Sequence, residues 1–220
     1  SSINATSCGE NSYNDIILEN YTITRDKIDF KLNIDKNSFS TTLKGKHNLF
    51  NIMFAVAIAK KIGLANEEIR HAIDNISKIT NMRLESITYG EDSLIINDAY
   101  NASPTSMKAA VDVISDLNDF EFKTLVLGSM FELGPNEVEY HSGIGTYINN
   151  NSRGINLVIS VGTLAKNITD NINNKDINTL HFSTVEEVTD YLKANKHKNE
   201  VILFKASRSM KLETIINDIK

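Results

Sequence analysis

Charged and amide side chains follow three short apolar runs of the sequence, each at the point where the run ends. The runs, with the residues after them, are 94–96 with Asp98 and Asn101, 124–127 with residues 128–134, and 201–204 with Lys205, Ser207 and Arg208. Apolar runs of this kind are typical of parallel strands buried on both faces. Because the carboxyl ends of parallel strands meet at one edge of a sheet, we expect these side chains to gather there, where open α/β sheets bind ligands.

The residue types at this edge leave more than one chemistry open. Asp98 and Asn101 offer hydrogen-bond acceptors and donors, but they could also belong to an ordinary strand-to-helix turn. Lys205 and Arg208 could bind an anion together with Ser207, and they could equally be solvated surface charges. A helix is predicted to begin directly after the turn, because Ser103 is a good N-cap and Pro104 suits the first helical position.

A second pair of amides lies at the start of a predicted helix, at 45–62. Asn48 and Asn51 are three residues apart and therefore share one helix face. Two stacked carboxamides could read the edge of a heterocycle, since each has a donor and an acceptor. The residues alone favour the alternative, in which the pair caps the helix and a loop.

The elements that must position these groups fall into two stretches with different periodicity. Residues up to about 14 lack a pattern, and 79–81 is a predicted linker. Between them, alternating apolar residues predict a small antiparallel sheet, followed by amphipathic helices. The predicted strands are 16–23, 28–34 and 39–43, and the predicted helices are 45–62 and 66–76.

From Arg83 onward, strands and helices alternate. The predicted strands are 84–88, 94–97, 124–127, 157–161, 180–182 and 201–204, and the helices are 104–117, 138–148, 164–172, 185–192 and 212–219. Gly143 and Gly145 fall inside a predicted helix and are interpreted as packing glycines. The predicted fold class is α/β: a mostly parallel sheet with helices on both faces, preceded by a small α+β segment.

Composition excludes several classes of protein. The net charge of −5 without a basic stretch argues against a nucleic-acid partner. A single cysteine, Cys8, excludes an internal disulfide and a cysteine-based metal site, and no His/Asp/Glu spacing suggests a metal site. No apolar run approaches the ~18 residues of a membrane span, and no signal peptide is evident, so we expect a cytoplasmic protein. Neither a dinucleotide fingerprint nor a phosphate loop is present.

Five motifs occur in the order and spacing of the Mur ligase family, which the chain resembles over roughly residues 15–220. They are GKHNLFN, NMRLE, INDAYNASPTSMKAA, LGSMFELG followed by His141, and KASRSMKLE. The DAYNASP and ELG motifs are similar to those of the members that add D-alanyl-D-alanine to UDP-MurNAc-tripeptide. The other elements are shared more widely within the family.

The resemblance implies an ATP-dependent amide ligase of peptidoglycan precursor synthesis that works through an acyl phosphate. It implies that residues 1–80 are the end of the central ATPase domain and that 81–220 are the C-terminal Rossmann-like domain. The family's phosphate loop, its Mg²⁺ ligands and its carbamylated lysine would lie upstream, so this chain alone should be inactive. The implied substrates are UDP-MurNAc-tripeptide and D-alanyl-D-alanine, and the expected state is a monomer.

The resemblance also implies roles for individual residues. Asn48 and Asn51 would read the adenine, Asp98 would bind the ribose hydroxyls, and Arg83 would reach the phosphates. Asn101 would be a further nucleotide-binding residue. It would lie toward the incoming dipeptide and the acyl phosphate. There Lys205, Ser207 and Arg208 would carry the catalytic role, and a positive pair could hold the dipeptide carboxylate.

Two departures from the family pattern affect this edge. Ser129 stands where the family has Asp, and Ala206 stands where it has Gly. Another Mur ligase or a folylpolyglutamate-synthase-like enzyme is one alternative, against which the DAYNASP turn argues. A non-catalytic module that binds a small ligand or a partner is another, and a phosphate loop upstream in the gene would exclude it.

Overall fold

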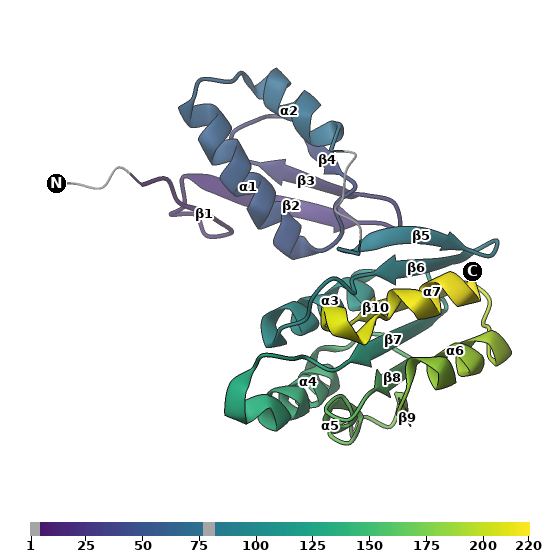
Figure 1. Cartoon of the computed structure of the whole chain (residues 1–220). Coiled ribbons are helices and arrows are strands. Elements are labelled where there is room, and N and C mark those ends of the chain that lie inside the picture. The colour runs from purple at the N-terminus through teal and green to yellow at the C-terminus, as the bar shows by residue number, and fades with distance from the viewer. Residues whose placement is uncertain (1–4, 77–81) are drawn as a thin grey trace. The chain divides into compact units, whose positions relative to one another are not determined.

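The chain forms two compact units, Ser1–Ile79 and Thr80–Lys220, which we call the N-terminal and C-terminal units. The structure is a computed structural model that describes residues 5–76 and 82–220 (Figure 1). The linker predicted at 79–81 lies outside the described residues. Each unit has its own sheet and its own hydrophobic core.

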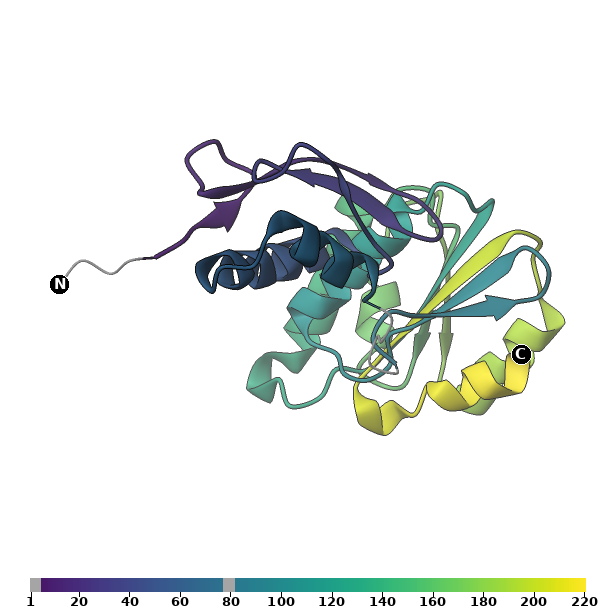
Figure 2. The ribbon, with the colours of Figure 1, turned by 90° about the horizontal axis from the view of Figure 1, so that it is seen from above.

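The N-terminal unit is a four-stranded sheet in the order β1-β2-β3-β4, with two helices on one face (Figure 2). Its elements are β1 (Cys8–Gly9), β2 (Ile16–Ile23), β3 (Ile28–Leu32), β4 (Phe39–Thr41), α1 (Lys46–Lys61) and α2 (Asn66–Asp74). The predicted antiparallel pairing of the three longer strands is confirmed. The stretch before residue 14, whose sequence lacks periodicity, contributes the two-residue β1, which pairs parallel to β2.

The core of the N-terminal unit explains why apolar and polar residues alternate along its strands. Apolar side chains of β2, β3 and β4 face the helices, and Phe30 and Phe39 stack with ring centroids 5.5 Å apart. From the helices, Leu49, Met53 and Ile69 pack against them and are fully or almost fully buried. Isolated two- or three-stranded sheets are marginal, so this helical cover supplies the burial that the sheet needs.

The C-terminal unit is the predicted α/β sheet, in the order β5-β6-β10-β7-β8-β9. Its strands are β5 (Glu85–Tyr89), β6 (Ser93–Asn97), β7 (Phe122–Gly128), β8 (Leu157–Val161), β9 (Asn178–Phe182) and β10 (Glu200–Lys205). Its helices are α3 (Pro104–Asp116), α4 (Glu137–Asn151), α5 (Lys166–Thr169), α6 (Val185–Ala194) and α7 (Glu213–Ile219), with 3₁₀ turns at Gly134–Asn136 and Arg208–Met210. All neighbouring strands run parallel except β5, which forms an antiparallel hairpin with β6.

Helices cover both faces of this sheet, as the fold class predicted (Figures 1 and 2). Helices α6 and α7 lie on one face, where Val188 and Ile215 join a core that includes Ile95, Ile159 and Phe204. Helices α3, α4 and α5 lie on the other face. β6, β8 and β10 are buried along their whole length, which is why they read as continuous apolar runs.

The two glycines of α4 have different surroundings. A Cβ at Gly145 would overlap the carbonyl oxygen of Ile168, so Gly145 is a packing glycine that lets α4 approach the α5 region. A Cβ at Gly143 would meet nothing within 4 Å, so the prediction of a packing role is wrong there.

Alanine substitutions should therefore change stability in opposite directions at these two positions. Gly145→Ala is expected to lower the free energy of unfolding by about 2 kcal/mol, because a backbone atom must move. Gly143→Ala should raise it by about 0.5–1 kcal/mol, since alanine is the better helix former where space is open. Urea denaturation followed by circular dichroism measures both, and an equal effect of the two variants would contradict the packing difference.

Within residues 5–76 and 82–220, no helix is both long and apolar enough to cross a membrane.

Candidate functional site

The three polar segments predicted to converge follow three neighbouring strands. β10 pairs in parallel with β6 on one side and with β7 on the other. The loops after these strands therefore open at the same carboxyl edge of the C-terminal unit. The backbone N–H of Asp98 donates to the carbonyl oxygen of Phe204 at 2.9 Å, which joins the first loop to the end of β10.

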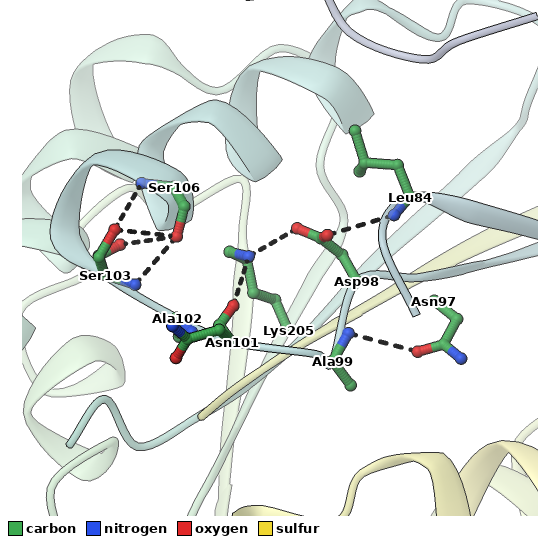
Figure 3. A network of polar contacts seen from close by, with 9 residues as sticks. All are labelled: Leu84, Asn97, Asp98, Ala99, Asn101, Ala102, Ser103, Ser106 and Lys205. Atoms are coloured by element: carbon green, nitrogen blue, oxygen red, sulfur yellow. Dashed lines mark hydrogen bonds and ion pairs between the residues drawn. The ribbon is translucent and has the colours of Figure 1, made fainter. Parts of the chain in front are cut away.

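A buried ion pair forms the centre of this edge. The Lys205 ammonium lies 2.6 Å from Oδ2 of Asp98 and donates to the carbonyl oxygen of Asn101 at 2.9 Å (Figure 3). Oδ1 of Asp98 accepts the N–H of Leu84 at 3.2 Å. The Lys205 side chain is 3% exposed and that of Asp98 is 16% exposed, so the surface-charge alternative is wrong for Lys205.

The loop after β6 ends in the predicted helix cap. The hydroxyl of Ser103 accepts the N–H of Ser106 (Figure 3). Pro104 occupies the first turn of α3. The side-chain oxygen of Asn101 accepts the N–H of Ala102 at 2.8 Å. With the Lys205 bond to its carbonyl oxygen, Asn101 is held on two sides, so this turn is fixed before any ligand arrives.

Arg83 lies beside the same loop. Its guanidinium stacks over the ring of Tyr100, 4.4 Å from the centroid, and the N–H of Tyr100 donates to the carbonyl oxygen of Met82 at 3.1 Å. Met82 and Leu84 have φ angles of 64° and 51°, so the backbone on both sides of Arg83 is left-handed. Among the residues that the structure describes, no carboxylate pairs with Arg83, and its side chain is exposed.

Sequence reasoning missed the groups that hold this turn. Oε2 of Glu85 accepts the N–H of Met82 at 3.0 Å and the side-chain amide of Asn97 at 3.3 Å. Oδ1 of Asp98 accepts the backbone N–H of Leu84, and a backbone donor cannot be recognised from residue types. The aromatic partner of Arg83 could have been found, because Tyr100 stands within the polar turn itself.

Ser207 and Arg208 are placed differently from each other. Ser207 is 6% exposed, and its hydroxyl accepts the N–H of Phe131 at 2.9 Å. Arg208 is mostly exposed and pairs with Glu213. The structure therefore gives Ser207 a bracing contact between two loops, whereas Arg208 stands at the rim.

Both departures from the family pattern are accommodated by packing. Ser129 is 2% exposed, and its hydroxyl accepts the N–H of Ala165 at 3.3 Å, so it ties the end of β7 to the segment after β8. Ala206 is buried opposite Gly128, where a Cβ would lie 2.6 Å from the Ala206 methyl. Ala206 has no positive φ angle, so its side chain adds no backbone strain.

Asn48 and Asn51 lie in the N-terminal unit, in the first turns of α1. The side-chain amide of Asn48 donates to the carbonyl oxygen of Lys44 at 2.7 Å, and its oxygen accepts the amide of Asn51 at 3.0 Å. The first contact ties the helix to the loop before it, as in the capping alternative, but among the described residues no side chain caps an N–H of the first turn of α1. Asn51 is exposed and Asn48 half-buried, so one edge of the pair faces solvent.

Apolar side chains stand at the same edge of the C-terminal unit as the ion pair. Four large hydrophobic residues, each 40–51% exposed, lie on the loops after β6 and β7 or in the first turn of α4: Tyr100, Phe131, Val138 and Tyr140. Ligand sites combine apolar walls with a few fixed polar groups. In the two described ranges, no three His, Cys, Asp or Glu side chains cluster closely enough to hold a metal ion.

Comparison with known families matches residues 82–208 to the model described as Mur ligase, glutamate ligase domain, which is more than half of the chain. The UDP-N-acetylmuramoyl-tripeptide–D-alanyl-D-alanine ligase of Bacillus subtilis is 37% identical over 98% of this chain and 48% of its own length. The enzyme of the same name from Buchnera aphidicola subsp. Baizongia pistaciae is 35% identical over 93% of this chain and 43% of its own length.

Among solved structures, MurF from Acinetobacter baumannii superposes with a TM-score of 0.82 at 24% identity. The superposition covers 97% of this chain and 46% of that one. The likeness confirms the fold of both units. The chain spans about half the length of the curated relatives that it matches.

Proposed function

The chain belongs to the Mur ligase family, and we propose that it forms the C-terminal half of a ligase that joins D-alanyl-D-alanine to UDP-MurNAc-tripeptide. One observation carries the proposal: 37% identity over 98% of the chain to an enzyme named for that reaction. Residues 1–80 would complete the central ATPase domain, and 81–220 would form the C-terminal domain. The protein would act in the cytoplasm as a monomer.

The reaction proceeds in two steps. ATP transfers its γ-phosphoryl group to the terminal carboxylate of the tripeptide, which gives an acyl phosphate and ADP. The ammonium group of D-alanyl-D-alanine loses one proton and becomes the free amine, which attacks the acyl carbon. A second proton then leaves the nitrogen, and inorganic phosphate departs as the amide forms. Such steps depend mainly on positioning and on electrostatic stabilisation of the transferring group.

The carboxyl edge of the C-terminal unit supplies the groups that suit a nucleotide. Asp98 is fixed by Leu84 and Lys205, and its two oxygens have lone pairs beyond these two bonds, so they can accept the ribose hydroxyls. The Arg83 guanidinium, stacked on Tyr100, is pre-organised for phosphate oxygens. From the N-terminal unit, Asn48 and Asn51 would read the adenine through their solvent-facing edge.

The later residues suit the second substrate. Arg208 at the rim would hold the dipeptide carboxylate by giving up its pair with the half-buried Glu213. Lys205 and Ser207 would serve the part of the site that faces the dipeptide and the acyl phosphate. Lys205 fixes Asn101, and Ser207 fixes the loop after β7. Mg²⁺ would screen the phosphates. The described residues hold no cluster for it, so its ligands would come from the part of the ligase outside them.

The ligation assay tests this function. The full-length protein containing these 220 residues should convert ATP, UDP-MurNAc-tripeptide and D-alanyl-D-alanine into the pentapeptide product, detected by mass spectrometry. The 220-residue chain alone should release no phosphate under the same conditions, because about half of the relatives' length is missing from it. Turnover by the isolated chain at ~1 per second or faster would contradict the proposal.

The same assay separates the alternatives. Ligation of a single amino acid in place of the dipeptide would indicate another Mur ligase, and ligation of glutamate to a folate would indicate a folylpolyglutamate-synthase-like enzyme. Nucleotide binding without any ligation would indicate a binding module.

A further inference from the structure

A fully buried histidine braces the loop after β7. His141, in α4, is 0% exposed. Its Nε2 accepts the N–H of Met130 at 2.8 Å, and its Nδ1 lies 2.6 Å from the carbonyl oxygen of Glu137. Both contacts are satisfied only by a neutral ring that carries its proton on Nδ1. Burial lowers the pKa of His141, which favours the same neutral form.

The loop is fixed at three successive residues. The carbonyl oxygen of Ser129 accepts the N–H of Ser207 at 3.1 Å, and the N–H of Phe131 donates to the hydroxyl of Ser207 at 2.9 Å. His141 holds Met130 between them. The segment after β10, which is distant in sequence, and helix α4, which follows the loop, thus determine the course of this loop.

The fixed loop presents two side chains outward. Phe131 is 40% exposed, and Glu132 is exposed with a φ angle of 62°. A left-handed backbone costs a non-glycine residue about 1–2 kcal/mol and persists where neighbours over-determine it, often at functional sites. A carboxylate and an aromatic ring are therefore carried by a braced loop, next to the loop that carries Lys205 and Arg208.

We propose that Glu132 binds the ammonium group of the incoming dipeptide and that His141 is the positioning residue that holds Glu132 in place. The inference rests on the proposed function for the identity of the amine. A zwitterionic dipeptide needs an anion at one end and a cation at the other. Glu132 supplies the anion. Arg208 supplies the cation from the neighbouring loop, which Ser207 joins to the loop of Glu132.

Steady-state kinetics of the full-length ligase test the proposal. Glu132→Gln removes the charge at an exposed position and should raise the KM for D-alanyl-D-alanine about 10-fold or more, with the KM for ATP changed less than about 2-fold. His141→Phe removes both ring contacts and should produce the same split. His141→Gln, which can accept and donate, should restore part of the loss.

His181→Phe is the matched control. Its ring contacts the buried hydroxyl of Ser160 at 2.9 Å from the outer strand β9, so it probes the general loss of a histidine contact. This variant should leave both KM values unchanged. An unchanged dipeptide KM in Glu132→Gln would overturn the proposal, as would equal changes of both KM values in His141→Phe.

Failure of the proposed function would look different. If the wild-type ligase accepts another amine, the proposed substrate is wrong, and the same variants assayed with that amine decide on Glu132 and His141 separately. A KM split with the new amine would support the positioning role, and its absence would overturn it.

Discussion

Lys205→Met is expected to lower the free energy of unfolding of the C-terminal unit by about 3 kcal/mol, because it breaks a buried ion pair on one side. The substitution leaves the carboxylate of Asp98 without its cation and the carbonyl oxygen of Asn101 without its donor. Urea denaturation of the 220-residue chain, followed by circular dichroism, measures the loss.

Lys166→Met provides the matched control. The Lys166–Asp170 pair has the same 2.6 Å separation, but both side chains are about half exposed, at 52% and 51%. Exposed pairs contribute little, so this variant should lose less than about 0.5 kcal/mol. Equal losses in the two variants would show that burial of the Lys205 pair has no energetic consequence.

Asp98→Ala is expected to raise the KM for ATP in the full-length ligase about 10- to 150-fold, the equivalent of a charge-assisted hydrogen bond of roughly 1.5–3 kcal/mol. The KM for D-alanyl-D-alanine should change less. Asp98 also braces the turn through Leu84 and Lys205, so a loss of stability is expected as well and does not by itself argue against nucleotide binding.

A substrate that lacks the ribose hydroxyls separates binding from bracing. With 2′,3′-dideoxy-ATP, the wild-type enzyme should already show the raised KM, and Asp98→Ala should add little to it. If Asp98 is only a brace, the substitution should impair the use of ATP and of the dideoxy analogue by the same factor. That result would remove Asp98 from the nucleotide site.

The fold was predictable wherever apolar periodicity alone determines an element. Strands β2 and β8 begin and end at the predicted residues, and a bounded apolar run marks β8. Periodicity does not distinguish types of helical turn. The helix predicted at 164–172 has only one α-helical stretch, Lys166–Thr169, flanked by turns such as Asn167 N–H to Leu164 carbonyl oxygen.

The candidate site was predictable in its location and less so in its contacts. Polar residues after apolar runs indicated the carboxyl edge, because parallel strands end together. Apolar runs do not show which strands are neighbours or how their residues align. The pairing of Lys205 with Asp98, 107 residues earlier, therefore could not be predicted. Backbone partners are equally invisible, which is why the roles of Leu84 and of the Met130 N–H had no sequence signal.

The measurement that tests the central claim most directly is a structure of the full-length ligase with a non-hydrolysable ATP analogue. The claim is that the carboxyl edge formed by β6, β10 and β7 contributes to the nucleotide site. The account predicts a ribose hydroxyl within about 3 Å of a carboxylate oxygen of Asp98, with the Arg83 guanidinium directed at the phosphates. An analogue bound with its ribose beyond hydrogen-bonding distance of Asp98 would contradict it.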